Sequence, residues 1–171
     1  MNLREEILRE YSQTQTNRII AWVGDDQKRF DDLVTLFLGH EYRVTQRAAS
    51  SLNHLAVEHP WLVRKHLPAL IENLELPQLH PAIKRNTLRL LQQLPIPEDN
   101  QARLFDCCLG FLHSNEEPIA VKVFAMSVAG NICVQQKELR HELVHLIQEQ
   151  FAHSSKGFQA KARITLKRIS F

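Results

Sequence analysis

The sequence predicts one all-α domain, an α-α superhelix of about five helical hairpins stacked side by side. Three observations predict it. Four segments share an apolar pattern at spacings of 39, 38 and 37 residues, another amphipathic segment precedes each of them, and only 5 of the 171 residues are glycine. Few glycines favour helices over turn-dense β folds. The apolar fraction of 44% and the charged fraction of 23% are those of an ordinary globular protein.

The repeats align without gaps at the first apolar position of each second helix, which is Val44, Ile83, Val121 or Phe158. Apolar or small residues follow four, eight and eleven positions later in every copy: Ala48, Thr87, Ala125 and Ala162, then Leu52, Leu91, Ala129 and Leu166, then Leu55, Leu94, Ile132 and Ile169. These offsets lie on one stripe of a 3.6-residue helix. We therefore expect second helices within residues 42–59, 80–94, 118–134 and 155–171.

A first helix precedes each second helix and has its own apolar stripe: Phe30–Phe37, Leu62–Ile71, Leu104–Leu112 and Leu139–Ile147. Turn and capping residues separate the helices at Asp25-Asp26, Gly39, Pro77, Pro81, Asp99, Pro118 and Ser154-Ser155. Residues 1–24 predict two shorter helices that stop at Gly24 and cover one end of the stack, with apolar stripes at Leu3, Ile7, Leu8 and Tyr11 and at Ile19, Ile20, Trp22 and Val23. Residues 25–171 then form four hairpins, and we expect one domain over residues 1–171.

Two stretches of the repeat resemble the HEAT family. The segment LPALIENL at residues 67–74 is similar to the proline-bearing first helix of a HEAT unit, and YRVTQRAA at residues 42–49 is similar to the start of the second. The resemblance covers about residues 25–171 and implies a HEAT/armadillo-type α-solenoid. It specifies an architecture and leaves the function open. Phe124 departs from the pattern, since a polar residue is usual there.

Charge is divided unequally between the two sets of helices. The four second-helix windows hold eleven basic residues and one acid, Glu58, for a net charge of +10; the rest of the chain holds ten basic and eighteen acidic residues, or −8, which gives the total of +2. In HEAT solenoids the second helices line the concave surface, so the resemblance implies a basic groove that attracts acidic partners.

The helical phase selects seven of these cations as partner-binding residues: Arg43, Arg47, Arg85, Arg89, Lys161, Lys167 and Arg168. The leading hypothesis is a non-catalytic interaction module that binds an acidic protein segment through them. The alternative is sequence-independent binding of DNA or RNA phosphates by the same residues. A third possibility is that these side chains only solvate the surface, and arginines such as Arg47 often join neighbouring HEAT repeats through hydrogen bonds.

Residues 141–145 match the H-E-x-x-H pattern, in which two histidines one helical turn apart bind zinc. The chain lacks a suitable third ligand, because Gln148 and Phe151 occupy the positions where metzincins have their glycine and third histidine. The repeat already explains Leu143 as a core residue. We expect a chance match, with no metal, cofactor or catalytic residue.

HEAT-like alkylpurine DNA glycosylases are a more distant resemblance. They hold duplex DNA in a basic concave surface and require an acidic residue and aromatic side chains there. In this chain Glu58 is the only carboxylate of the second helices, and Tyr42 and Phe171 are the only aromatics at their ends. An enzyme of this kind is therefore the least favoured alternative.

The remaining signals predict a soluble, cytoplasmic protein that does not bind membranes. The chain is charged from its fourth residue, and no apolar run approaches the roughly 20 residues that span a bilayer. Cys107, Cys108 and Cys133 fit neither a disulfide framework nor a zinc site. Trp22 and Trp61 are expected to be packing residues, since large aromatic side chains are mostly buried.

Overall fold

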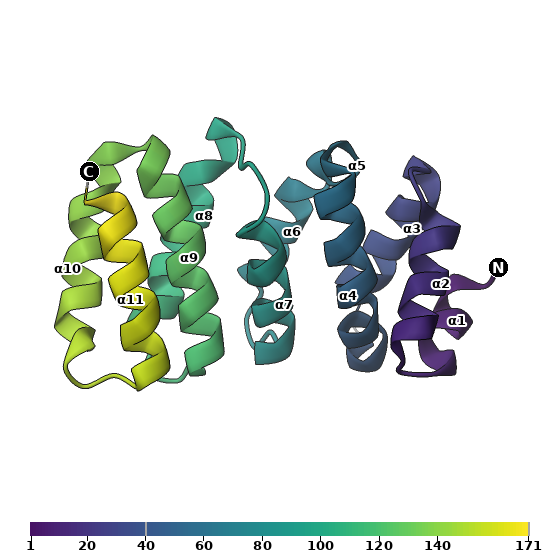
Figure 1. Ribbon diagram of the computed structural model, residues 1–171, viewed down its shortest axis with the longest axis horizontal. Helices are drawn as coiled ribbons and strands as arrows, with labels where there is room; N and C mark the ends of the chain where they lie inside the picture. The colour runs from purple at the N-terminus through teal and green to yellow at the C-terminus, as the bar shows by residue number, and fades with distance from the viewer. Residues whose placement is uncertain (40, 171) are drawn as a thin grey trace. The chain divides into compact units, whose positions relative to one another are not determined.

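The computed structural model describes residues 1–39 and 41–170. Within these ranges every regular element is a helix and no strand occurs, so the predicted all-α fold class is confirmed (Figure 1). The helices pair into five hairpins. They form two compact units, Met1–Leu94 and Pro95–Phe171. The prediction that the whole chain is one domain stays a prediction. None of the described helices is long and apolar enough to cross a membrane.

The first unit contains three hairpins arranged in two layers. Its helices are α1 (Leu3–Arg9), α2 (Gln13–Val23), α3 (Gln27–Leu38), α4 (Tyr42–Glu58), α5 (Pro60–Arg64), α6 (Leu67–Leu74) and α7 (Pro81–Leu91). The second helices α2, α4 and α7 lie side by side in one layer (Figure 1). The first helices α1 and α3, with the α5–α6 pair, form the other layer.

The ends of these helices follow from capping chemistry. Side-chain oxygens of Asn2, Ser12 and Asp26 accept hydrogen bonds from the backbone N–H three residues later, at 3.4, 3.0 and 3.0 Å. Gly24 ends α2 at φ +52°, a conformation that glycine adopts without steric cost. Gly39 ends α3. The predicted cap at Asp26 and the two glycine stops are thus confirmed.

The first helix expected over Leu62–Ile71 is instead two short helices, α5 and α6. Pro68 is the second residue of α6, where its missing N–H has no helical partner to lose. A continuous helix would press the proline ring against the carbonyl of Arg64, four residues earlier. Accordingly α5 ends at Arg64.

The second unit contains two hairpins built from α8 (Glu98–His113), α9 (Ile119–Gln135), a 3-10 turn η1 (Lys137–Leu139), α10 (Arg140–Phe151) and α11 (Lys156–Ile169). The second helix α9 packs against both α8 and α11. The close approach of α9 to α11 requires Gly130, because a Cβ there would lie 2.9 Å from Cγ2 of Thr165. Ser155 caps α11 as predicted.

One predicted cap in the second unit is wrong. Asp99 lies inside the first turn of α8, and Pro97 is the residue that precedes the helix. The ring of Pro97 holds its φ at −58°, which already directs the chain into a helix. Asp99 instead places its negative charge beside the free N–H groups of the first turn, where an acid is favourable.

The repeat register predicts the core well. Val44, Val121 and Phe158 are buried, as are the small residues Ala48, Ala125 and Ala162 that follow them by one turn. Ile83 is only half-buried. Small side chains at this second position let neighbouring helix axes approach closely.

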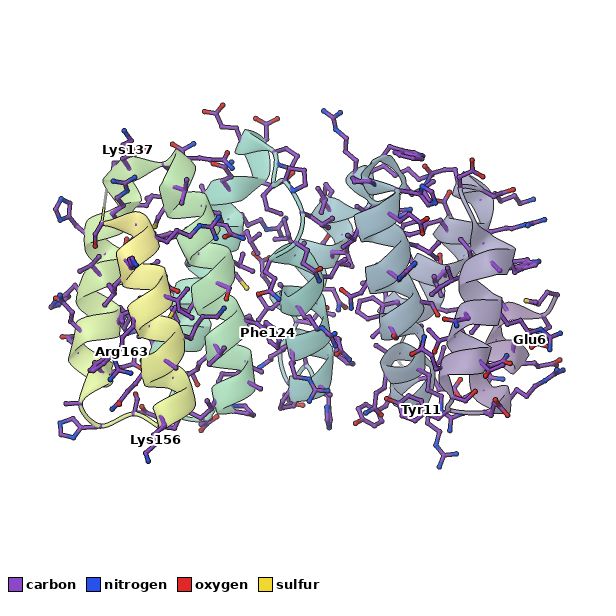
Figure 2. All side chains as sticks on the ribbon, in the orientation of Figure 1. Glu6, Tyr11, Phe124, Lys137, Lys156 and Arg163 are labelled. Atoms are coloured by element: carbon purple, nitrogen blue, oxygen red, sulfur yellow. The ribbon has the colours of Figure 1, made fainter. Side chains whose placement is uncertain are left out.

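Two aromatic residues expected to pack inside are exposed. Tyr11 is 78% exposed because α1 ends at Arg9, before the apolar stripe reaches it (Figure 2). Trp61 is 59% exposed because α5 is only five residues long and buries its Leu62 and Val63 instead. The prediction that Trp61 is a packing residue is therefore wrong. Trp22 is half-buried, with the Arg29 guanidinium 4.8 Å from its ring centroid.

Hydrogen bonds from long polar side chains to backbone carbonyls join consecutive hairpins. Arg47 on α4 donates to the carbonyl of Leu8 at 2.8 Å, and Gln27 on α3 donates to that of Leu62 at 3.0 Å. In the second unit, Gln150 on α10 donates to the carbonyl of Leu112 at 2.8 Å. The donor and the acceptor of these three hydrogen bonds are 39, 35 and 38 positions apart in the sequence, which is about one repeat.

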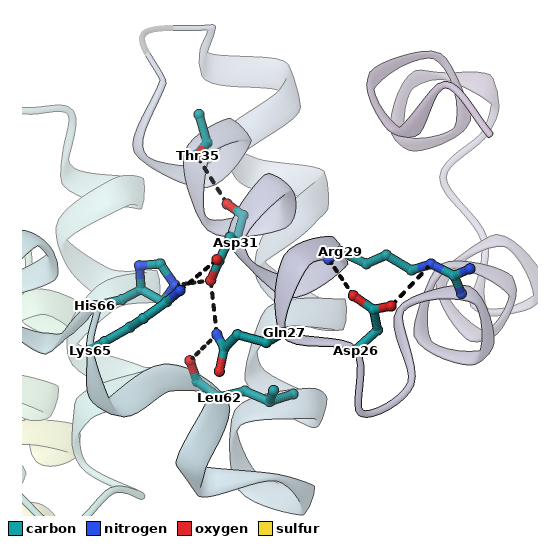
Figure 3. Close-up of polar contacts among 8 residues, drawn as sticks. All are labelled: Asp26, Gln27, Arg29, Asp31, Thr35, Leu62, Lys65 and His66. Atoms are coloured by element: carbon teal, nitrogen blue, oxygen red, sulfur yellow. Dashed lines mark hydrogen bonds and ion pairs between the residues drawn. The ribbon is translucent and has the colours of Figure 1, made fainter.

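A carboxylate cluster joins α3 to the α5–α6 connection in the first-helix layer (Figure 3). Asp31 Oδ2 lies 2.6 Å from Lys65 Nζ, and its Oδ1 lies 2.6 Å from His66 Nε2 and 2.8 Å from Gln27 Nε2. Burial raises the pKa of Asp31, but the hydrogen bonds from Lys65, Gln27 and His66 outweigh it and lower the pKa to about 2. The charge of Asp31 is therefore compensated within this layer.

Candidate functional site

A groove of about 450 Å³ lies between α4 and α7 in the first unit, lined by Ser50, Asn53, His54, Val57, Glu58, Arg89 and Gln93. The two helices lie next to each other, and their equivalent residues are 39 positions apart. Arg89 therefore corresponds to Ser50 and Gln93 to His54. We call this feature the α4–α7 groove.

Three arginines of α4 and α7, of which only Arg89 lines the α4–α7 groove, have no acidic partner among the described residues. Arg43 and Arg89 are exposed, and Arg85 is half-buried. Among residues 1–39 and 41–170, no carboxylate forms an ion pair with any of the three. Their charges are thus available to a ligand, in contrast to the compensated charge of Asp31.

Arg47, a fourth cation of the predicted set, is committed to the fold. Its Nη1 donates to the carbonyl of Leu8, and its guanidinium lies 5.9 Å from the centroid of the Tyr11 ring. Arg47 therefore joins α4 to the end of α1, and less of its positive charge is available to a ligand.

The groove changes character along its length. Glu58, the single carboxylate of the second-helix windows, lies at the C-terminal end of α4, with His54 Nε2 3.2 Å from its Oε2. Val57 is exposed at the same end. Arg43 lies at the N-terminal end of α4, Arg85 in the middle of α7 and Arg89 in the last turn of α7. The groove therefore has a cation, Arg89, on its α7 side, and a carboxylate and an exposed valine at the C-terminal end of α4.

The cations of the second unit divide in the same way into free and engaged groups. Lys167 is exposed and Lys161 half-buried, and neither has an ion pair within the described part of the chain. Arg168 Nη1 donates a hydrogen bond to Asn131 Oδ1 on α9. The Arg163 guanidinium lies 5.2 Å from the centroid of the Phe151 ring (Figure 2).

Lys122 is the only charged residue of α9, and it does not contribute to the surface. Its side chain is buried, with Nζ 3.2 Å from Gln150 Oε1. Burial lowers the pKa of Lys122, although nearby Glu117 acts in the opposite direction. The exposed side of α9 is therefore uncharged. Phe124, which departs from the repeat pattern, projects from α9 on the side opposite α11 (Figure 2).

The H-E-x-x-H segment lies on the exposed side of α10. His141, Glu142 and His145 are all exposed, and His145 Nε2 lies 3.3 Å from Glu149 Oε1. Within the described residues, no three histidine, cysteine or acidic side chains gather as a metal site would require. Cys108 and Cys133 are unreactive by environment, because burial raises the pKa of Cys133 to about 11 and also raises that of Cys108.

The residues considered for base excision are not assembled into a catalytic group. Tyr42 stacks against His80, with ring centroids 4.5 Å apart, and Glu58 faces His54. Phe171, the other aromatic considered, lies outside the described residues. No acid and aromatic pair of the described second helices therefore forms the arrangement that the distant resemblance implies.

Sequence reasoning missed the residues that line the α4–α7 groove other than Arg89 and Glu58. Charge is the property that selects the seven predicted partner-binding residues, and Ser50, Val57 and Gln93 are uncharged. The repeat register holds the missing signal, because Ser50 and Arg89 both lie six positions after the first apolar residue, and His54 and Gln93 both lie ten after it. The prediction that the seven cations bind a partner stays a prediction.

A family model of the HEAT repeat domain matches residues 3–169, nearly the whole chain. No curated protein and no solved structure matches.

Proposed function

The chain belongs to the HEAT repeat family, and we propose that it is a non-catalytic interaction module that binds an acidic segment of a partner protein through its second helices. HEAT repeat domains are generally protein-interaction scaffolds that bind partners along extended surfaces. The use of the second helices as the binding face and the acidic character of the partner are our proposals. A cytoplasmic location likewise stays a prediction.

The absence of acidic partners for Arg43, Arg85 and Arg89 carries the proposal. Unpaired guanidinium groups beside a groove attract carboxylates, and their planar forks bind carboxylates through two parallel hydrogen bonds. A few such groups match a peptide that carries a few acidic side chains.

A protein segment fits this surface better than duplex nucleic acid. Duplex DNA presents one negative charge about every 1.7 Å along its axis, so a binding protein normally offers a long cationic track. Here Arg47 and Lys122 are engaged in the fold, and the exposed side of α9 is uncharged. The open cations are therefore few and local.

The test is fluorescence anisotropy at low salt with a labelled glutamate-rich peptide and a labelled DNA duplex. The double charge reversal Arg85→Glu/Arg89→Glu should weaken peptide binding by about tenfold or more, which corresponds to about 1.4 kcal/mol. The matched control is Lys28→Glu/Arg64→Glu, the same charge change on exposed residues of the first helices; its affinity should stay within about twofold of the parent. Lys161→Glu/Lys167→Glu then measures the share of the second unit.

Three results would contradict the proposal. One is no peptide binding at low salt, and another is equal weakening by the test and control reversals. The third is preferential binding of the duplex, with log affinity falling by about 0.9 per phosphate contact against log salt, which would establish the nucleic-acid alternative instead.

A further inference from the structure

Two large apolar side chains are exposed at the C-terminal end of α4 and in the helix that follows it. Val57 is 47% exposed and lines the groove, and Trp61 is 59% exposed four residues further along the chain. The two belong to consecutive helices separated by a single residue, His59, whose ring centroid lies 4.9 Å from that of Trp61. Tryptophan, tyrosine and arginine are the residue types enriched at binding hot spots, so an exposed tryptophan is a candidate contact for a partner.

The same groove therefore offers a cationic section and an apolar section in a fixed order. Arg85 and Arg89 lie on α7, and Val57 lies near the end of α4, which runs alongside it. Glu58, whose Oε2 lies 3.2 Å from His54 Nε2, places a carboxylate at the apolar end. Because like charges repel, the partner's carboxylates meet least repulsion at the arginine section.

The helical rise gives the spacing between the two sections. Arg89 stands six positions after the first apolar residue of its repeat, and Val57 stands thirteen after that of its own. Seven residues at 1.5 Å each separate them by about 10 Å along the helix axes. An extended peptide advances about 3.3 Å per residue and so covers this distance in about three residues.

We infer that the first unit selects acidic segments that also carry an apolar side chain about three residues from a carboxylate, the carboxylate binding Arg89 and the apolar group packing on Val57 and Trp61. This inference rests on the proposed function and refines it. The occupant is a segment of another protein, because the groove needs an acid and an aliphatic or aromatic group on one extended backbone.

The experiment uses the full chain with Trp22→Phe, so that Trp61 is the remaining tryptophan. The first probe is a glycine-based peptide with consecutive glutamates and a leucine about three residues beyond them. The second replaces the leucine with serine, and the third moves the leucine next to the glutamates. Versions with the order of acid and leucine reversed are included, since the groove accepts a chain in either direction.

The leucine peptide should bind about tenfold more tightly than the serine and shifted peptides and should move the Trp61 emission to shorter wavelength. This advantage should disappear in Trp61→Ala and in Val57→Ser, while both variants keep their salt-dependent affinity for the serine peptide. Ile164→Ala is the matched control, because Ile164 is an exposed apolar residue, 63% exposed, on the second unit; the tenfold advantage should persist there.

Equal affinities of the leucine and serine peptides for the parent would overturn the inference and leave the proposed function intact. Failure of every peptide to bind at low salt would overturn both. A single-stranded oligonucleotide that quenches Trp61 and outcompetes the leucine peptide would also overturn it, because bases would then be the groups that stack on this tryptophan.

Discussion

Replacing Asp31 with asparagine tests how much the carboxylate cluster of the first-helix layer contributes to stability. The pKa of Asp31 is about 2 in the folded chain, against an ordinary value of about 3.9. A difference of about 1.9 pKa units corresponds to about 2.6 kcal/mol in favour of the folded state at neutral pH. Because the side chain is 32% exposed and solvent screens its ion pairs, we expect Asp31→Asn to cost about 1–2 kcal/mol.

The pH dependence distinguishes this electrostatic contribution from a loss of shape. The folded pKa of Asp31 is lowered, so the stabilisation is complete well above pH 4 and disappears as the pH falls toward 2. About half of it should be gone by pH 3. The difference in unfolding free energy between the parent and Asp31→Asn should shrink accordingly.

Urea unfolding followed by tryptophan fluorescence is the appropriate assay. Both tryptophans of the chain, Trp22 and Trp61, lie in the first unit, so their emission reports the unit that contains Asp31. Asp32→Asn is the matched control, since Asp32 is the exposed neighbour outside the cluster. The reasoning is refuted if the two variants lose the same stability, or if the cost of Asp31→Asn is the same at pH 7 and pH 3.

Three further variants test the packing and the assignment of cations. Gly130→Ala should lower stability by about 1 kcal/mol, because overpacking against Thr165 costs more than the gain in helix propensity; the same change in a Thr165→Ser background should stabilise the chain in thermal melts followed by circular dichroism. Arg47→Met should cost about 1–2 kcal/mol through the lost hydrogen bond to Leu8 yet keep peptide affinity within about twofold; a loss like that of the Arg85/Arg89 reversal would contradict its structural role. Lys122→Met should lower the melting temperature at pH 7, because it leaves Gln150 Oε1 and nearby Glu117 without the ammonium group, and an unchanged or higher melting temperature would contradict this.

The helix positions could be predicted because they depend on periodic burial. Val44, Val121 and Phe158 occupy one register, and each begins a stripe that only a helix places on a single face. The break between α5 and α6 could have been found from Pro68, whose effect on the residue four before it is local. Trp61 could not be placed from its side chain alone, since its exposure follows from the shortness of α5.

The cationic surface could be predicted only in outline. Helical phase gives the direction of a side chain from its own axis, but it does not identify the group that the side chain meets on the next helix. Lys122 and Arg47 carry the same charge as Arg89, yet the first reaches Gln150 and the second reaches a backbone carbonyl. Such pairings depend on groups of the neighbouring hairpin, 28 and 39 positions away along the chain.

The hydrogen bonds between consecutive hairpins place unequal demands on the two residues that they join. Arg47, Gln27 and Gln150 must each supply a long donor side chain, but the acceptors at Leu8, Leu62 and Leu112 are main-chain carbonyls that any amino acid provides. In each of these three hydrogen bonds, only the donor is therefore encoded in side-chain identity. If a hairpin were duplicated or exchanged, the donor side chain would still meet a main-chain carbonyl on the neighbouring hairpin. Hydrogen bonds of this kind therefore suit a protein built from stacked repeats.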